Sequence, residues 1–595
     1  MKYLQKIFIC IVIFASTILS QDSWIRINQL GYQKESIKTA VFVSKTDVKL
    51  NSFQVINSDN NEVVINGTNV KAFNEYASFK STFRLNFSEL KEDGNYYIQA
   101  EGIKSPAFKI SDNVYDGSAD FLLNYMRQQR CGYNPFFKDS CHTHDGFLVD
   151  NPGHDSVYVD VKGGWHDASD YLQYLTTSAN ATYQMLFAFS KNPEVFKDHF
   201  DKDGNKGGNG IPDILDEAKW GLDWLVKMNP EYGVMYNQIA DDRDHAGYRL
   251  PTKDSVSYGK GFERPVYFIT GKRQGLAKYK NRTTGVSSSA AKFASAFALG
   301  SDLLKKYYPD FAESILNKAE DAYKFAKSDI GVTQTASNIS PYFYEEDNYA
   351  DDMELAAVQL YVTKNDDGYL SEAIYWGQVE PFTPWMGADT ARHYQWYPFV
   401  NLGHYHLSKV EDEKSSSLFK SHLIKGLQKI YDRGKDNAFI NGVPYIWCSN
   451  NLVAAALTQV RLYEELTGNK KFAEMEASLR DWLFGCNPWG TSMIVGLPEN
   501  GDFPTHPHSS LTVLHNYEIS GGLVDGPVYG KIFKSLIGLK LYEEDEYAKF
   551  QSDLVVYHDD FGDYSTNEPT MDGTASLSFY LSALEALGKK KKKID

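Results

Sequence analysis

A change in hydrophobic periodicity near residue 114 constrains the fold of this 595-residue chain more than any other feature. Before it, short β-branched and aromatic runs such as residues 40–43 and 96–99 are separated by turn residues, which predicts strands. After it, apolar residues recur every three to four positions, which predicts helices. We therefore expect a multidomain chain, with an immunoglobulin-like β-sandwich at residues 24–112 and an all-α domain at residues 115–588.

The helical pattern is clearest from Pro212 to Met228, where the proline suits the first turn and apolar residues fall on one face. Comparable segments are predicted at 168–190, 288–306, 310–327, 349–362, 396–409, 415–432, 449–467, 472–484 and 575–587. A helical domain of this size is often a closed ring of helical hairpins. Its long loops are rich in Gly, Asp, Asn and aromatic residues, and such loops tend to carry catalytic residues.

The N-terminus predicts an exported protein. Lys2 and Lys6 are followed by an apolar run over residues 7–19, which is typical of a secretory signal peptide at residues 1–20. An uncleaved membrane anchor is the alternative. We expect a secreted monomer that does not use a membrane as a partner, with a basic tail at residues 589–595.

The formal net charge of −16 argues against partners that require a basic surface. Nucleic acid binding depends on Lys and Arg contacts to phosphate, so nucleic acid is disfavoured, and acidic polysaccharides are disfavoured for the same reason. Aromatic residues make up 14% of the chain. They either enlarge the core or line a sugar-binding cleft, because pyranose rings present apolar faces that pack on aromatic rings.

A first candidate site is the segment GGWHDASD at residues 163–170. The helical pattern places Asp167 and Asp170 at the start of a predicted helix, with both side chains on one side. Together the two carboxylates can hold one water molecule while one of them takes its proton. The alternative is that either aspartate only caps the helix.

A second candidate site is the segment YHDDFGDYSTNE at residues 557–568, just before the last apolar helix. Glu568 lies among aromatic residues, and burial there would raise the pKa of its carboxyl, as a general acid requires. The alternative is an acidic turn on the surface.

Together these segments resemble glycoside hydrolase family 9, the cellulase family with an (α/α)6 barrel. Residues 163–170 are similar to the family's GGW[HY]DAGD motif, NGIPDILDE at 209–217 matches a family segment residue for residue, and residues 557–570 fit its C-terminal acid signature. The resemblance covers roughly residues 115–588. INQLGY at residues 27–32 resembles the immunoglobulin-like module that precedes some members' barrels.

The resemblance implies a glycoside hydrolase that cleaves β-1,4-glucosidic bonds with inversion, endo-acting and without an organic cofactor. Asp170 matches the general base, Asp167 the partner that helps to hold the water, and Glu568 the general acid. An inverting pair must leave room for water, so we expect the carboxyls of Asp170 and Glu568 about 6.5–9.5 Å apart. The alternatives are an exo-acting cellodextrinase or cellobiohydrolase and, in another class, a non-catalytic glycan-binding protein.

The chain also departs from the family's pattern. Ser169 replaces the usual Gly, Thr574 replaces the usual Asn, and the family's histidine followed by arginine appears as HPHSS at residues 506–510. His508 keeps the expected sugar contact but the arginine is absent, which leaves the preferred substrate length open.

The expected substrate-binding residues are His508, Trp447, Trp385, Tyr564 and Asp559, with Trp396 as a further candidate. Ordinary packing explains each aromatic residue equally well. The polar segment DRDH at residues 242–245 either lines the cleft or forms a salt-bridge network.

Four residues are candidate zinc ligands: Cys131, Cys141, His142 and His166. They resemble a structural zinc site in family members that carry the immunoglobulin-like module. Because His166 precedes Asp167, zinc there would anchor the catalytic loop. A Cys131–Cys141 disulfide is the alternative in an exported protein, and the two histidines favour zinc.

Calcium is expected at two further places. The first is an oxygen-rich pattern that lacks EF-hand spacing and comprises Asp201, Asp203, Asn205 and Asp213. An unliganded acidic turn is the alternative there. The second is the pair Asp351 and Asp352, which resembles a calcium-binding acidic pair of the family.

Overall fold

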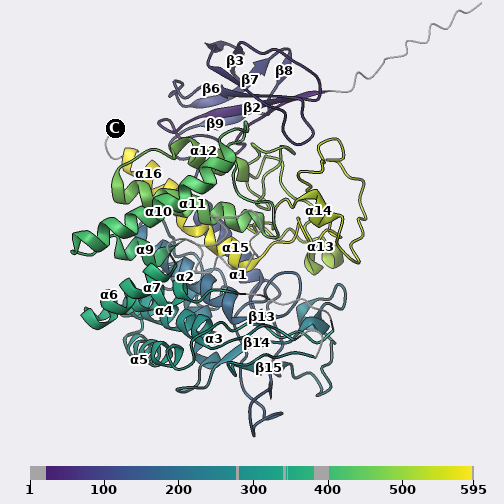
Figure 1. The fold of residues 1–595 in the computed structure, drawn as a ribbon. Coiled ribbons are helices and arrows are strands. Elements are labelled where there is room, and N and C mark those ends of the chain that lie inside the picture. Colours follow the sequence, from purple (N-terminus) through teal and green to yellow (C-terminus); the bar gives the residue numbers. More distant parts are fainter. Residues whose placement is uncertain (1–21, 277–279, 340–343, 345, 381–400, 593–595) are drawn as a thin grey trace, which may run out of the picture.

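A computed structural model describes residues 22–276, 280–339, 344, 346–380 and 401–592. The predicted signal peptide at 1–20, Trp385 and Trp396 lie outside these residues. A small β-rich domain stands at one end of the molecule, and a helical domain forms the rest (Figure 1). No helix within the described ranges is both long enough and apolar enough to cross a membrane.

The N-terminal domain packs two antiparallel sheets face to face. One has the strand order β1-β2-β6-β5, and the other has the order β4-β3-β7-β8 with β9 also paired to β7. The strands are β1 (Ser23–Arg26), β2 (Thr39–Ser44), β3 (Phe53–Asn57), β4 (Val63–Gly67), β5 (Val70–Phe73), β6 (Ser81–Asn86), β7 (Gly94–Ala100), β8 (Ile103–Lys104) and β9 (Phe108–Ile110). In β7 buried and half-exposed residues alternate toward its C-terminal end, as expected for a sheet with one face in a core.

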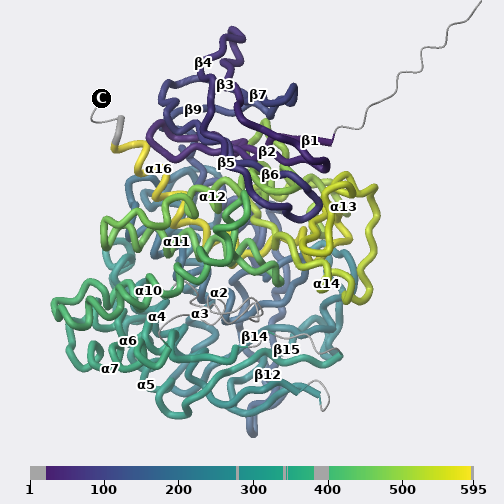
Figure 2. The backbone as a smooth tube through the Cα atoms, turned by 45° about the horizontal axis from the view of Figure 1, so that its top comes forward, coloured from purple at the N-terminus to yellow at the C-terminus, as the bar shows by residue number. Residues whose placement is uncertain are grey.

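Strand β2 is buried along its whole length because its two faces belong to different cores. Phe42 lies in the sandwich core, whereas Val41 and Val43 lie in the core of the helical domain. Figure 2 shows this sheet beside α12, and Arg84 of β6 donates to Ser478 of that helix at 2.8 Å. Polar contacts add to the interface, since the amide of Asn28 donates to Asp481 at 2.8 Å. The two domains therefore share one continuous packed interface.

The helical domain contains long helices joined by extended loops. Those described are α1 (Ser118–Gln128), α2 (Leu175–Lys191), α3 (Asp213–Met228), α4 (Ser287–Leu304), α5 (Pro309–Ala326), α6 (Ala350–Lys364), α7 (Asp367–Val379), α9 (Leu402–Leu407), α10 (Glu413–Gly434), α11 (Ser449–Thr467), α12 (Ala473–Leu483), α13 (Ser510–His515), α14 (Gly530–Phe533), α15 (Met571–Ser576) and α16 (Ser578–Lys592). Most of the long predicted helices agree closely with these bounds.

The helix predicted from residue 168 is wrong at its start, because α2 begins at Leu175. Asp167 and Asp170 lie in the preceding loop, where the Asp170 carboxylate accepts a hydrogen bond from the amide of Leu172 at 2.9 Å. Residues 173–174 then form β13, which pairs with β14. The side chain of Asp170 thus stabilises a local turn that competes with helix formation.

The helical domain also contains small sheets that the helical pattern did not predict. One has the order β12-β15-β14-β13 and lies beside the loop that carries Asp170. The other is a two-stranded hairpin of β10 and β11. Their bounds are β10 (Gly132–Asn134), β11 (Asp139–Cys141), β12 (Phe147–Val149), β13 (Gln173–Tyr174), β14 (Tyr236–Ile239) and β15 (Pro265–Phe268).

Candidate active site

The two acidic segments, far apart in the sequence, meet in the helical domain. The backbone amide of Ser169 donates to Oε1 of Glu568 at 3.0 Å. Because Ser169 directly precedes Asp170, this bond places the two predicted catalytic carboxylates beside each other. Their separation of about 6.5–9.5 Å stays a prediction.

Segment 209–217 supports the loop that carries Asp170. Glu217 accepts from Arg130 at 2.7 Å and from the indole of Trp165 at 2.8 Å. Gly164 has φ of +70°, and a Cβ there would lie 2.7 Å from the ring of Trp224. The second family-like segment therefore holds the first one in place.

Glu568 is partly buried, and its surroundings raise the pKa of its carboxyl. Burial raises the pKa of its carboxyl; His508 opposes this shift, and the negative charge of Asp170 adds to it. The net pKa lies above the ordinary value for glutamate. A raised pKa favours the protonated carboxyl, which is the form that a general acid requires.

Asp167 is buried and engaged with the protein on both oxygens. Oδ1 accepts from the hydroxyl of Thr177 at 2.7 Å, and Oδ2 accepts from the hydroxyl of Tyr344. Burial and the charges of Asp170 and Asp572 raise its pKa well above the ordinary value. The structure thus assigns Asp167 an anchoring role in the loop, while its predicted contact with water must use the remaining lone pairs.

His245 is the one member of the 242–245 segment that reaches the predicted base. Its Nε2 lies 3.4 Å from Oδ2 of Asp170. Although burial lowers the pKa of the imidazole, Asp170 outweighs this and raises it to about 9. Asp244 instead accepts from the amide of Tyr171 at 2.6 Å and from Arg249 at 2.9 Å. The sequence pattern identified this segment, but not which residue contacts Asp170.

The ion pair between His245 and Asp170 predicts a pH-dependent stability. The folded-state pKa of His245 is raised above its ordinary value of 6.5, so the stabilisation is full below pH 6.5 and is lost as the pH rises through about 9. Wild type and His245→Gln should therefore differ in free energy of unfolding at pH 6 and converge near pH 9.5. Because the imidazole is 37% exposed, we expect a difference of about 1 kcal/mol or less.

Denaturant unfolding at the two pH values measures this difference. A gap between the two proteins that widens toward alkaline pH would contradict the pairing.

Three of the predicted substrate-binding residues lie together beside the Glu568 segment. The ring of Tyr564 lies 5.8 Å from that of Trp447 and 6.2 Å from that of His508. Nδ1 of His508 lies 2.5 Å from the carbonyl of Phe561, which fixes the orientation of the imidazole. These half-buried aromatic residues form a surface on which a pyranose ring can pack.

Asp559 does not fit its predicted role in substrate binding. Oδ2 accepts from the amide and hydroxyl of Thr505 at 2.7 and 2.9 Å, and Oδ1 accepts from the amide of His506 at 2.9 Å and from Asn567 at 3.0 Å. Its carboxylate is buried. Since four donors already occupy it, Asp559 holds the loop that leads to His508.

Thr574, which replaces the family's Asn, also has a structural role. Its hydroxyl donates to the carbonyl of Thr570 at 2.7 Å and accepts from the amide of Leu523 at 3.0 Å.

A loop after α14 packs against the aromatic residues of the site, and no sequence motif predicted this contact. The hydroxyl of Tyr564 donates to the carbonyl of Ile537 at 2.9 Å, and the ring of Tyr542 stacks on that of Phe561 at 4.9 Å. Asp560 accepts from the amide of Tyr542 at 2.7 Å. The side chain of Ile537 is 91% exposed beside the aromatic cluster.

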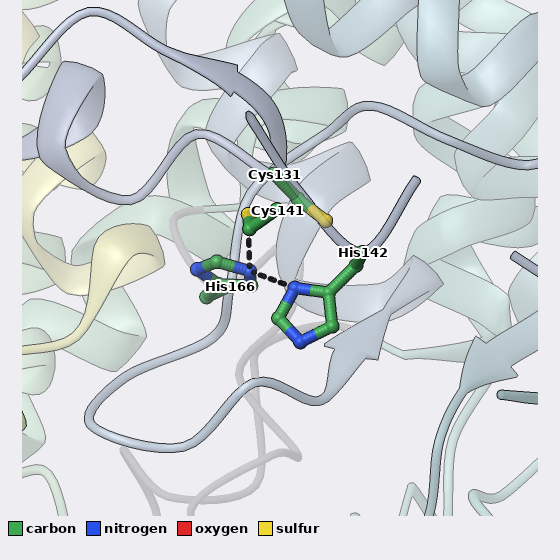
Figure 3. A group of neighbouring side chains, drawn as sticks. All are labelled: Cys131, Cys141, His142 and His166. Atoms are coloured by element: carbon green, nitrogen blue, oxygen red, sulfur yellow. Dashed lines mark hydrogen bonds between the residues drawn. The ribbon is translucent and has the colours of Figure 1, made fainter. Parts of the chain in front are cut away.

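The predicted zinc ligands converge behind the catalytic loop (Figure 3). The ligand atoms of Cys131, Cys141, His142 and His166 all lie within 4.8 Å of one another. Nε2 of His166 is 3.8 Å from the sulfur of Cys141 and 3.3 Å from Nδ1 of His142. A tetrahedral zinc site with bonds of about 2.0–2.3 Å requires ligand separations close to these. The four residues therefore fit a metal ion.

The surroundings of this cluster support the same conclusion. Nε2 of His142 lies 3.1 Å from Asp254, an arrangement that orients a metal-binding imidazole. Cys131 and Cys141 are free thiols, so the alternative disulfide is not formed. Both are buried at the base of the β10–β11 hairpin.

At the first predicted calcium site the three carboxylates do not converge. Asp201, Asp203 and Asp213 are not among the groups of described His, Cys, Asp and Glu residues whose ligand atoms all lie within 4.8 Å of one another. Oδ1 of Asp213 accepts from the amides of His199 and Phe200, and its other oxygen lies 3.3 Å from Arg127. Asp201 accepts from the amides of Asp203 and Asn205, so this loop is closed by its own hydrogen bonds.

The second predicted calcium site, at Asp351 and Asp352, contains a lysine ammonium. Nζ of Lys292 lies 2.7 Å from Oδ2 of Asp352. One oxygen of the predicted calcium-binding pair is therefore already paired with a cation, and calcium binding there stays a prediction.

A helical domain in which two predicted catalytic carboxyls lie close together indicates the class of glycoside hydrolases. The chain belongs to glycosyl hydrolase family 9, because the model of that family matches residues 115–581. The model of the cellulase N-terminal ig-like domain matches residues 20–105. These matches confirm the predicted fold class, an immunoglobulin-like sandwich followed by an (α/α)6 barrel.

Named relatives agree with this family. Endoglucanase D of Acetivibrio thermocellus is 26% identical, covering 82% of this chain and 75% of the relative. A cellodextrinase of Butyrivibrio fibrisolvens is also 26% identical, covering 94% of this chain and 99% of the relative. The crystal structure of a metagenome-derived family 9 endoglucanase superposes with a TM-score of 0.76 at 25% identity, covering 95% of this chain and 99% of that one.

Proposed function

We propose that this glycoside hydrolase cleaves β-1,4-glucosidic bonds within β-glucan chains and inverts the anomeric configuration. The observation that carries the proposal is the hydrogen bond from the amide of Ser169 to Glu568, which holds the acid next to the base-bearing loop. Similarity to an endoglucanase and the aromatic surface beside Glu568 support a glucan substrate.

In the proposed mechanism each carboxyl moves one proton. Glu568, whose pKa is raised by burial, gives its proton to the glycosidic oxygen as the bond to the anomeric carbon breaks. Asp170 takes a proton from a water molecule that attacks this carbon from the opposite face. The imidazolium of His245 stabilises the ionised form of Asp170.

We also propose that the metal held by the Cys and His cluster is zinc and that its role is structural. Two thiolates and two imidazoles are ligands that zinc prefers, and four protein ligands leave no open position for substrate. The apolar N-terminal run supports export to a compartment outside the cytoplasm.

An exo-acting cellodextrinase is the second candidate, and the full-length similarity to a cellodextrinase favours it. The products released from cellohexaose separate the two. A single product size from the earliest times would indicate exo-action.

Asp170→Asn should lose nearly all activity, about 10²–10⁴-fold, because asparagine cannot take the proton from water. The assay compares wild type and variant on carboxymethylcellulose, mixed-linkage β-glucan and xyloglucan. Loss in the variant supports the base assignment, and the best substrate identifies the preferred glucan. If wild type cleaves none of these glucans or short cello-oligosaccharides, the proposed activity is wrong and glycan binding without catalysis becomes the better explanation.

A further inference from the structure

The start of α6 contains a buried ion cluster that lies outside the proposed catalytic pair. Nζ of Lys292, from α4, lies 2.5 Å from Oε1 of Glu346 and 2.7 Å from Oδ2 of Asp352. The three side chains are 6%, 4% and 1% exposed, respectively. A lysine is rarely buried to this degree unless carboxylates compensate its charge.

Calcium at this place would need six to eight oxygen ligands around one point. Here one oxygen of Asp352 already contacts an ammonium, and a divalent cation held by the same carboxylate would lie within a few ångströms of that positive charge. Asp351 accepts from the amide nitrogen of Asn348 at 2.7 Å, and the same nitrogen lies 3.2 Å from Glu380. The neighbours of Asp351 and Asp352 therefore include a cation and a donor group.

We propose that the ammonium of Lys292 takes the place of a bound calcium ion at Asp351 and Asp352, so that the start of α6 is stable without this metal. From the neighbouring helix α4, Lys292 compensates the negative charge of the carboxylates in the first turn of α6. Unlike a bound metal ion, this charge is part of the chain and cannot be removed by dilution or chelation.

The cluster also retains carboxylate oxygens that a cation could contact. One oxygen each of Asp351, Asp352 and Glu380 is buried without a hydrogen-bond partner. These same oxygens make calcium uptake the outcome that would count against the proposal.

The cluster lies close along the chain to a residue that contacts the catalytic loop. Glu346 follows Tyr344 by two residues, and the hydroxyl of Tyr344 donates to Asp167. Glu346 itself is held further by Gln334, whose side-chain amide donates to the carbonyl of Glu346 at 2.8 Å.

The test compares wild type, Lys292→Met and the control Lys305→Met, which removes an exposed ammonium at the end of the same helix. Each protein is dialysed into calcium-free, zinc-supplemented buffer, so that the Cys and His cluster stays loaded. Bound calcium is then counted by elemental analysis, and Tm is measured without calcium and with millimolar calcium. These readouts use no substrate, so they stand even if the proposed activity is wrong.

We expect wild type and Lys305→Met to bind no calcium at this cluster and to keep the same Tm in both buffers. Lys292→Met leaves buried carboxylates unpaired, so its Tm should fall by about 5–10 °C without calcium. Millimolar calcium should restore at least half of that loss, with about one calcium bound per chain.

Two results would overturn the proposal. The first is calcium uptake by wild type that Asp351→Asn abolishes. The second is a Tm of Lys292→Met equal to that of wild type without calcium. If Lys292→Met does not fold, the double variant Lys292→Met with Glu346→Gln removes one positive and one negative charge together. This variant should fold and gain the calcium response, and a folded double variant without that response would also contradict the proposal.

Discussion

Replacing Glu568 by glutamine should lower kcat on β-glucan by about 10²–10⁴-fold and leave Tm nearly unchanged. The carbonyl of glutamine can still accept the hydrogen bond that the amide of Ser169 gives to Glu568, so the local structure should persist. What is lost is the proton that the leaving oxygen needs. Initial rates on β-glucan and a thermal melt measure the two effects.

An activated substrate separates an acid from a residue that only shapes the site. In an aryl β-cellobioside with a weakly basic leaving group, that group departs without being protonated. Glu568→Gln should therefore retain far more of the wild-type rate on this substrate than on β-glucan. Equal losses on both substrates would remove the acid assignment, and so would wild-type activity on β-glucan.

Replacing Cys141 by serine should lower Tm by on the order of 10 °C, through loss of the proposed zinc ion, which would join the β10–β11 hairpin to the catalytic loop. Cys141 and His166 both contribute to the cluster, and His166 directly precedes Asp167. The remaining folded protein should still turn over substrate at lower temperature, because no ligand position of the metal is open for chemistry. Elemental analysis and a thermal melt check both expectations.

Cys486→Ser is the matched control, since Cys486 is a buried free thiol whose sulfur contacts the carbonyl of Arg26 at 3.4 Å rather than the cluster. It should keep about one zinc per chain and show a smaller change in Tm. A Cys141→Ser protein with unchanged zinc content and Tm would show that the cluster is not a structural metal site.

The principal elements of the candidate site could be predicted because they are encoded locally. Asp170 and Glu568 lie in short segments with recognisable spacing, and the four Cys and His residues stand out by type. His245 and Tyr344 could not be assigned in the same way. Their contacts with Asp170 and Asp167 join loops that are distant along the chain.

The order of the domains could be predicted from the amino-acid sequence, because a period near two or near 3.6 reflects which faces of a strand or helix are buried. The candidate carboxylates and metal ligands could also be predicted, because their side-chain chemistry is independent of the fold. Three features could be found only in the folded chain: α2 begins at Leu175, Asp559 holds a loop, and Lys292 pairs with Asp352. Each of these depends on which hydrogen-bond donor or opposite charge lies within about 3 Å of a carboxylate, and residues remote in sequence supply most of those partners.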